Sequence, residues 1–398
     1  MLQTLNDTSI LPPLLMTSEK NSFAEYTILV RKPAIIDQII KANHYPSHII
    51  QALLDFKKEI LNHKIQPIKE NTSDREIWQG DLGKWTGKTW LELPWFLAET
   101  FFYRRVLEIT GHFQPGPWMG YDPFRPMKLE EINRSLTKFS HQYLAMEKEY
   151  SYEVFKEICQ QALWGNRGDL SHIDLEDNNN RKNQEDILID HTEEAYQYLQ
   201  TGIKAVAYIC DNVGEEFFYD LLLIDWLLSN HLAEKISVYI KNQPFFVSDV
   251  TNDDVQLTLN RIGSSNTHQI KELASRLKYK FANGSLVIRE PTFFTLAKDF
   301  REFPNNLVKE FSEHQLAIIK GDANYRRLIG DRHWPYTTPI QKAAGYFPTS
   351  FLSLRTLKSE LIIGLSNHQV EHLSQNAESD WLTNGLRGII TFHLKQTD

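Results

Sequence analysis

Residues 203–232 read IKAVAYICDNVGEEFFYDLLLIDWLLSNHL, and they join a short apolar run to a longer one through a polar turn. The first run, Ile203–Cys210, is rich in β-branched and aromatic residues and predicts a strand. The second run, Gly214–Leu232, predicts a long buried helix. A strand followed at once by a helix indicates a parallel sheet whose strands are connected by helical crossovers.

Short apolar runs recur between residue 236 and the C-terminus and predict further strands. They are Ile236–Ile240, Phe245–Ser248, Leu286–Ile288, Leu316–Ile319 and Gly388–Phe392. Their nearly continuous apolar character is typical of a sheet that is covered on both faces. We therefore expect an α/β fold in residues 201–398, namely a three-layer α/β/α sandwich with a mainly parallel, doubly wound sheet.

Residues 1–200 predict a helical N-terminal region packed on this sandwich. Four segments place apolar residues three and four positions apart, which marks one buried helical face in each. These segments are Pro46–Asn62, Leu93–Glu108, Leu129–Lys148 and Tyr152–Leu163. The polar and charged stretch Leu175–Asp190 is expected to form a surface loop.

Charge and cysteine content exclude several classes of protein. The 398 residues include 43 Lys and Arg against 51 Asp and Glu, a formal net charge of −8, so we expect no nucleic acid and no membrane as partner. Cys159 and Cys210 are too few for a disulfide scaffold or a cysteine-based zinc site. The sequence contains neither a signal-peptide pattern nor an apolar stretch of membrane length, so we expect a cytoplasmic location.

Acidic and amide side chains follow three of the predicted strands. Asp211 and Asn212 follow the first, Asp249 follows the run at 245–248, and Asp322 follows the run at 316–319. Because the carboxyl ends of parallel strands meet at one edge of a sheet, these oxygens are expected to converge and to suit Mg²⁺ or Mn²⁺. The alternative is that each residue only caps the helix that comes after it.

Basic residues cluster in the same part of the sequence. They are Lys320, Arg326, Arg327, Arg332 and Lys358. A metal ion together with Lys or Arg is what a phosphoryl group requires, although some of these side chains could instead be solvated. The sequence has no glycine-rich dinucleotide motif, no phosphate-binding P-loop and no GxSxG elbow. Glu99, Arg104 and Arg105 lie on a predicted aromatic-rich helix, and we expect them to form a buried ion pair that supports the site.

Six segments together carry a resemblance to a known family. They are WFLAETFFYRR (95–105), WGNRGDLS (164–171), DN (211–212), FVSD (246–249), KGDANYR (320–326) and RTLK (355–358). In this order, from about residue 20 to the C-terminus, the chain resembles the metal-dependent damage-control phosphatases, in the branch also called acidic residue methyltransferase. The last segment fits the RTxK signature of the third subfamily.

The resemblance implies a helical region on an α/β/α metal-binding phosphatase domain that hydrolyses phosphate monoesters of small metabolites. Sugar phosphates such as fructose 1-phosphate and fructose 6-phosphate are the implied substrates, and magnesium, manganese, cobalt or nickel is the implied ion. By match to the motifs, the metal ligands are Asp211, Asn212 and Asp249, and the substrate-binding residues are Asp322, Ala323, Asn324, Tyr325, Arg326 and Lys358.

The mechanism and two other functions stay open at this point. We expect Asp211 and Asp249 to be catalytic, with attack on phosphorus either by a water molecule at the metal or by Asp211 itself. The alternatives to a phosphatase are an S-adenosylmethionine-dependent protein-glutamate methyltransferase and a metal-binding protein without activity. Residues 164–169 either close over the site or cap a helix. The sequence does not indicate the oligomeric state.

Overall fold

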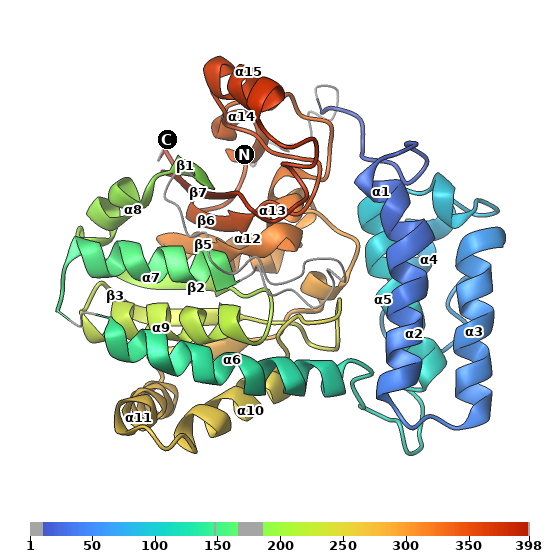
Figure 1. Cartoon of the computed structure of the whole chain (residues 1–398), viewed down its shortest axis with the longest axis horizontal. Coiled ribbons are helices and arrows are strands. Elements are labelled where there is room, and N and C mark those ends of the chain that lie inside the picture. The colour runs from blue at the N-terminus through green and yellow to red at the C-terminus, as the bar shows by residue number, and fades with distance from the viewer. Residues whose placement is uncertain (1–10, 147–148, 166–185, 397–398) are drawn as a thin grey trace.

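The computed structural model describes residues 11–146, 149–165 and 186–396 (Figure 1). An N-terminal bundle stands beside a larger domain built on a sheet. The bundle contains α1 (Phe23–Tyr26), the π-helix η2 (Thr27–Arg31), α2 (Lys32–Ala42), α3 (Ser47–Asn62), α4 (Arg75–Gly83), the 3₁₀ helix η3 (Trp90–Glu92) and α5 (Trp95–Thr110).

The order of residues explains how the bundle packs. Helix α3 buries Ile49, Leu53, Phe56 and Ile60, which are spaced four, three and four positions apart and so share one face. Helix α5 is buried around nearly its whole circumference, as expected for the central helix of the bundle. It ends at Gly111, whose φ of 78° is the left-handed C-cap conformation that glycine favours.

The larger domain contains a sheet of seven strands. They are β1 (Ile187–Asp190), β2 (Ile203–Ile209), β3 (Ala233–Tyr239), β4 (Leu286–Arg289), β5 (Leu316–Lys320), β6 (Ser350–Thr356) and β7 (Gly388–His393). Their spatial order is β1-β7-β6-β5-β2-β3-β4. All neighbouring strands are parallel except β6 and β7, which are antiparallel.

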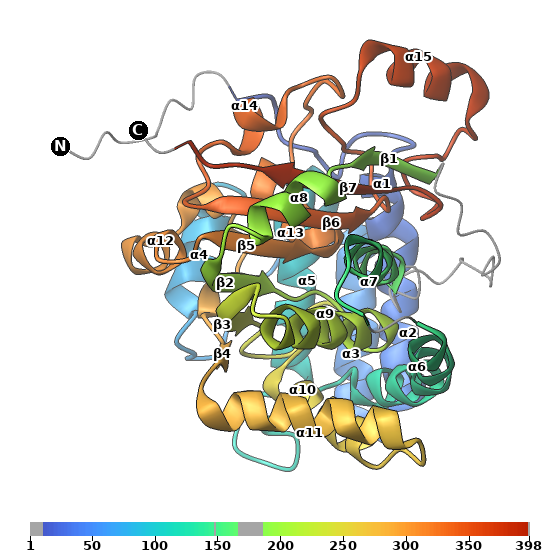
Figure 2. The same ribbon diagram turned by 90° about the vertical axis from the view of Figure 1, so that its left-hand side faces the viewer.

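Helices cover both faces of this sheet (Figure 2). One layer holds α6 (Arg125–Ala145), α7 (Tyr152–Trp164), α8 (Thr192–Leu199), α9 (Glu215–Ser229), α10 (Asn252–Gly263) and α11 (His268–Asn283). The other holds α12 (Asn305–Ser312), α13 (Gly321–Ile329), α14 (Ile340–Ala344), α15 (Asn367–Asn376) and the 3₁₀ helices η6 (Thr292–Thr295) and η7 (Phe300–Glu302). In β2, Val206 and Tyr208 face the first layer, whereas Ala207 and Ile209 face the second. The expected α/β/α sandwich with a mainly parallel sheet is therefore confirmed.

Three details of the prediction are wrong. Phe245–Ser248 is a turn and not a strand, because Phe246 has a φ of 47°, which no strand residue adopts. The loop predicted at Leu175–Asp190 ends too late, because residues 187–190 form strand β1. Residues 175–185 of that predicted loop lie outside the described residues. Strand β6 was missed because polar residues interrupt its sequence, SFLSLRT, so that it has neither a continuous apolar run nor a regular alternation, yet all seven residues are buried.

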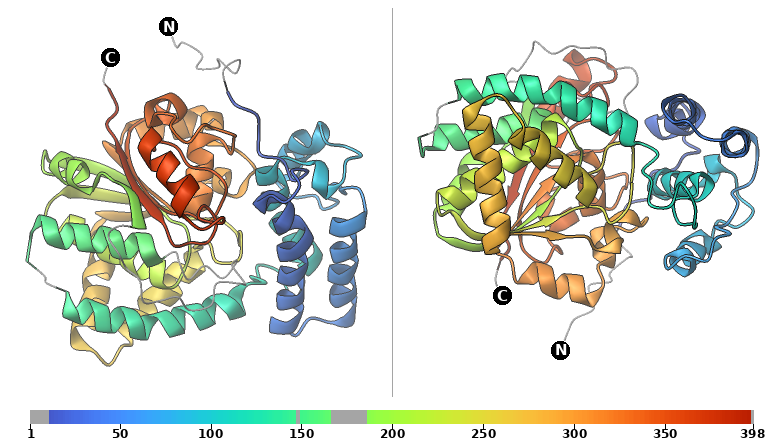
Figure 3. Two further views of the ribbon diagram at one scale, coloured as in Figure 1. Left: turned by 45° about the horizontal axis from the view of Figure 1, so that its top comes forward. Right: turned by 90° about the horizontal axis from the view of Figure 1, so that it is seen from below.

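The two parts of the molecule are joined by the N-terminal segment as well as by the chain after α5 (Figure 3). Leu15 donates its backbone N–H to the carbonyl of Asp331 in the sandwich and accepts a hydrogen bond from the N–H of Trp95 in the bundle. Helices α6 and α7 and strand β1 come before residue 201 in the chain, yet they pack in the sandwich. The division of the chain into two domains at residue 200 stays a prediction. None of the helices in the described ranges is both long and apolar enough to cross a membrane.

Candidate active site

The order of the strands creates a crevice at one edge of the sheet. The chain leaves β2 toward β3 and leaves β5 toward β6, which lie on opposite sides of the β2–β5 pair. Ligands of open α/β sheets bind at such a switch point, beyond the carboxyl ends of the strands. Asp211 and Asn212 come just after β2, and helix α13 begins directly after β5 at Gly321.

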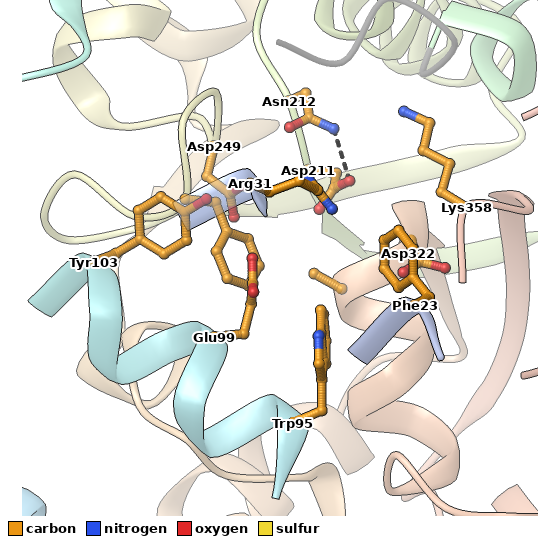
Figure 4. A pocket seen from close by; sticks show the side chains of 12 residues that line it. Phe23, Arg31, Trp95, Glu99, Tyr103, Asp211, Asn212, Asp249, Asp322 and Lys358 are labelled. Carbon is orange, nitrogen blue, oxygen red and sulfur yellow. Dashed lines mark hydrogen bonds between the residues drawn. The ribbon is translucent and has the colours of Figure 1, made fainter. Parts of the chain in front are cut away.

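A pocket of about 480 Å³, its mouth included, lies at this place. Its lining residues are Phe23, Arg31, Trp95, Glu99, Tyr103, Asp211, Asn212, Phe246, Asp249, Asp322, Ala323 and Lys358 (Figure 4). The structure thus brings together the expected metal ligands Asp211, Asn212 and Asp249 with Lys358. The bundle supplies the opposite wall.

Asp211 reaches its position because the residue facing it is glycine. Gly321 has a φ of 80°, and a Cβ atom built on it would lie 1.8 Å from Oδ2 of Asp211. Any larger residue would therefore displace either the carboxylate or the start of α13. The close approach places the Asp211 carboxylate at the N-terminal end of a helix, where the helix dipole favours negative charge.

Hydrogen bonds fix the orientation of Asn212. Its Nδ2 donates to Oδ2 of Asp211 at 2.8 Å and to Oε2 of Glu216 at 3.1 Å, and its Oδ1 accepts from Oγ of Ser248 at 2.6 Å. A backbone bridge pairs Asn212 with Asp249. Asp211, Asn212 and Asp249 are therefore held together by main-chain as well as side-chain bonds.

Two buried lysines hold the segment that carries Asp249. Nζ of Lys241 lies 2.8 Å from Oδ2 of Asp249, and both side chains are buried. Nζ of Lys128, on α6, donates to the main-chain carbonyl of Asp249 and to Oδ2 of Asp254, each at 2.8 Å. Neither lysine can be recognised from the sequence, because isolated lysines are normally solvated and only the fold brings these two to Asp249.

The three expected ligands fit a hard divalent ion. Two carboxylates and one amide offer oxygen donors, which Mg²⁺ and Mn²⁺ prefer. Within the ranges that the structure describes, no three His, Cys, Asp or Glu side chains group as a metal site, so the set depends on the amide of Asn212. An ion here would share the carboxylate of Asp249 with Lys241.

Asp322 lines the pocket, but its oxygens are engaged by the protein. Nε of Arg355 donates to Oδ1 at 2.7 Å, and Nε of Arg326 donates to Oδ2 at 3.0 Å. Burial raises the pKa of Asp322, but the guanidinium groups of Arg355 and Arg326 outweigh this effect and hold the pKa well below its usual range. Asp322 is therefore a fixed negative charge in the wall.

The remaining residues of the KGDANYR motif lie at different depths. Ala323 lines the pocket beside Asp322. Asn324 and Tyr325 are buried behind the wall, where Nδ2 of Asn324 donates to the carbonyl of Cys210 at 3.1 Å. Arg326 stacks over Trp95 at 3.7 Å from the ring centroid and also pairs with Asp331. Contact of Asn324, Tyr325 and Arg326 with substrate stays a prediction.

The expected basic cluster does not form a surface for phosphate. Lys320 is buried, and its Nζ lies 2.8 Å from both Glu216 and Asp220. Arg327 is also buried and donates to the backbone carbonyls of Phe294, Leu296 and Lys298. Arg332 is bound to the carbonyl of Pro12. That part of the prediction is wrong for these three residues, and of the cluster Lys358 is the member that lines the pocket.

A chain of buried polar contacts lies behind Asn212. Lys320 binds Glu216, and Glu216 accepts from Asn212. Tyr208 donates to Oδ1 of Asp220 at 2.7 Å, and burial raises the pKa of Asp220 to about 6. Because the members of this chain are all buried, a change in one would shift the orientation of Asn212.

The bundle side of the pocket departs from the expected ion pair. Glu99 pairs with Lys32 at 2.5 Å, whereas Arg104 pairs with Asp74 and Arg105 with Glu108, so the predicted pairing of Glu99 with the two arginines is wrong. Trp95, Glu99 and Tyr103 belong to the quoted motif at residues 95–105. Phe23 and Arg31 also line the wall, but nothing in the sequence points to them.

The segment at residues 164–169 is described only at its start. Trp164 ends α7, and Gly165 packs against the first turn of α9, where a Cβ atom would lie 2.7 Å from Cα of Glu216. Residues 166–169 lie outside the described residues, so the choice between a cover and a cap stays open.

Comparisons with known proteins point in the same direction as the geometry. Residues 27–373 match the family described as Damage-control phosphatase ARMT1-like domain. A protein from Mus musculus named Damage-control phosphatase ARMT1 is 30% identical to the chain, over 96% of this chain and 98% of that protein. The protein of the same name from Danio rerio is 29% identical, over 96% of this chain and 97% of that protein. A crystal structure of a DUF89 family protein from Pyrococcus horikoshii shares the fold, with a TM-score of 0.52 and 14% identity, over 92% of this chain and 98% of that one.

Proposed function

The chain belongs to the damage-control phosphatase ARMT1-like family, and we propose that it hydrolyses phosphate monoesters of small metabolites with a divalent ion at Asp211, Asn212 and Asp249. Its membership makes it a phosphatase, and the family is generally metal-dependent. The observation that supports the site is the convergence of these three oxygen-bearing side chains with Lys358 in one pocket.

An ion bound by the three side chains would supply the positive charge that a phosphoryl group needs as its oxygens gain charge in the transition state. Lys358, which follows the carboxyl end of β6, would bind one of these oxygens. The backbone N–H groups in the first turn of α13 would bind another, because they begin a helix directly beside Asp211.

Asp211 is proposed as the acceptor of a proton from the attacking water. The water oxygen bonds to phosphorus, the ester oxygen leaves with its electron pair and takes up a proton as the alcohol, and inorganic phosphate remains. Oδ2 of Asp211 already accepts from Asn212, which fixes the carboxylate for this role. A phosphorylated Asp211 trapped by rapid quench and identified by mass spectrometry would contradict this assignment.

The wall of the pocket suits a sugar phosphate, such as fructose 1-phosphate or fructose 6-phosphate. Trp95, Tyr103 and Phe246 provide apolar faces, and Glu99 provides a hydrogen-bond acceptor for hydroxyl groups.

The test is release of phosphate from a panel of sugar phosphates by protein that is first stripped of metal and then supplied with Mg²⁺, Mn²⁺, Co²⁺ or Ni²⁺. We expect turnover only after an ion is added, and loss of at least about 100-fold in kcat/KM for Asp249→Asn, because this variant lacks one charged ligand. Asp253→Asn is the matched control, since Asp253 is exposed four positions further along the chain. A folded protein that binds Mn²⁺ but hydrolyses none of these esters would contradict the proposal.

A further inference from the structure

Arg31 enters the pocket from an irregular turn of the bundle. Helices α1, η2 and α2 follow one another without a break from Phe23 to Ala42, and the π-helix lies in the middle. The N–H of Lys32 donates to the carbonyl of Thr27, five residues back. Pro33 explains the change of spacing, because it has no N–H and its ring would collide with the carbonyl four residues earlier in a regular helix. Such π-turns are common at functional sites.

The π-turn directs Arg31 into the protein, whereas the two residues before it face outward. Leu29 and Val30 are 40% and 49% exposed, whereas Arg31 is 6% exposed and lines the pocket. Its guanidinium lies 5.4 Å from the ring centroid of Phe23, a cation–π contact that limits the directions in which it can point. Figure 4 shows Arg31 among the side chains that line the pocket, next to Asp211 and Asp249 in this view.

The charges around the pocket indicate what Arg31 faces. Several acidic side chains in the wall lie against a cation of the protein. Lys241 contacts Asp249, Lys32 contacts Glu99, and Arg326 and Arg355 contact Asp322. Among the described residues that line the pocket, the cations are Arg31 and Lys358, one from each part of the molecule. A phosphate monoester carries nearly two negative charges at neutral pH.

We infer that Arg31 contacts the phosphoryl group of the substrate and forms with Lys358 a two-sided clamp on its oxygens. The inference rests on the proposed function, and it adds a catalytic residue from the helical bundle. A guanidinium suits this task because its planar fork binds two phosphoryl oxygens at once and keeps its charge. The sandwich alone would then hold the ion, whereas tight binding of phosphate would need the bundle.

The test measures the affinity of the full-length, Mn²⁺-loaded protein for inorganic phosphate by calorimetry. The same variants are titrated with Mn²⁺ alone and assayed for kcat/KM. We expect Arg31→Ala to weaken phosphate binding and to lower kcat/KM by tenfold or more, about 1.4 kcal/mol or more. Arg31→Lys should recover part of the phosphate affinity but little of kcat, because the ammonium keeps the charge without the fork. Mn²⁺ affinity should stay within about twofold in both variants.

Val30→Ala is the control, because it alters an exposed residue of the same π-turn. Unchanged phosphate affinity and kcat/KM in Arg31→Ala would overturn the clamp while leaving the proposed function intact. Equal loss of Mn²⁺ and phosphate affinity would also overturn it, since Arg31 would then only support the fold. If the wild-type protein neither binds phosphate nor releases it from any ester, the proposed function itself fails.

Discussion

Replacing Gly321 by alanine tests how the pocket is assembled. The variant Gly321→Ala has two separable effects, one on the backbone and one on Asp211. A residue with a Cβ atom at the observed φ of 80° costs about 1–2 kcal/mol of stability. The Cβ atom would also lie 1.8 Å from Oδ2 of Asp211, far inside van der Waals contact, so the carboxylate has to move.

Gly284 allows the two effects to be told apart. It ends α11 with a φ of 79°, and nothing lies within 4 Å of a Cβ atom placed there. Gly284→Ala therefore carries the backbone cost of about 1–2 kcal/mol without a collision. Gly284→Ala should therefore shift the urea midpoint by the backbone cost alone, and Gly321→Ala should shift it by at least as much, as measured in metal-free buffer by circular dichroism.

The site should respond only to the change at Gly321. We expect Gly321→Ala to weaken Mn²⁺ binding by about 100-fold, or about 2.7 kcal/mol, because a displaced Asp211 no longer completes the ligand set. Its kcat/KM should fall at least as far, whereas Gly284→Ala should match the wild type in both measurements. The reasoning is refuted if Gly321→Ala keeps Mn²⁺ affinity and kcat/KM within about threefold of wild type.

Three further changes test the charges around the pocket. Lys241→Met removes the cation 2.8 Å from Asp249, so the free energy of unfolding of the metal-free protein in urea should fall by about 3–5 kcal/mol. Saturating Mn²⁺ should restore part of this loss. Equal destabilisation with and without Mn²⁺ would argue against an ion at Asp249. Lys358→Ala should raise KM for the best sugar phosphate about tenfold while Mn²⁺ affinity stays constant, and a constant KM would remove Lys358 from the phosphate site. Asp322 has a depressed folded pKa, so its stabilising contribution is complete above its unfolded pKa of about 3.9 and is lost as the pH falls through the folded value. Asp322→Asn should therefore be less stable than wild type by about 3 kcal/mol at pH 7. Urea unfolding between pH 7 and pH 2.5 should show that this difference in unfolding free energy becomes smaller below pH 4. A difference that does not depend on pH would contradict an ionised Asp322 in the folded protein.

The sequence predicts those site residues that directly follow a recognisable strand. Asp211 and Asn212 directly follow a strand that its β-branched residues identify, so their place at the sheet edge was predictable. Asp249 was assigned to the same edge through a strand that does not exist. It lies there because backbone bonds pair its turn with Asn212, and a local reading of 245–248 does not contain that pairing.

The sequence did not predict which charged side chains are buried. Lys320, Arg326 and Arg327 were interpreted as phosphate-binding or solvated groups, and Lys241 was not singled out, since lysine and arginine are rarely buried unless they are paired. Some of their partners lie far along the chain, as when Lys320 reaches Glu216 across 104 positions. Others are near in sequence, such as Asp249 for Lys241 and Asp322 for Arg326, but only the fold shows that these pairs are buried. Arg31 was invisible for a related reason, because its inward direction depends on a π-turn next to Pro33 and not on a regular helical period.

The cations behind the wall bear on how the site works before substrate arrives. Carboxylates gathered in one buried pocket repel one another, and burial makes each more costly to ionise. Lys241 at Asp249 and the two arginines at Asp322 place positive charge beside these carboxylates and so offset part of this repulsion. An arriving ion then adds positive charge to a wall whose own charge is already partly balanced. That added charge would attract a dianion, so the proposed site would bind phosphate in an acidic chain with Arg31 and Lys358 as the cations among the described pocket-lining residues.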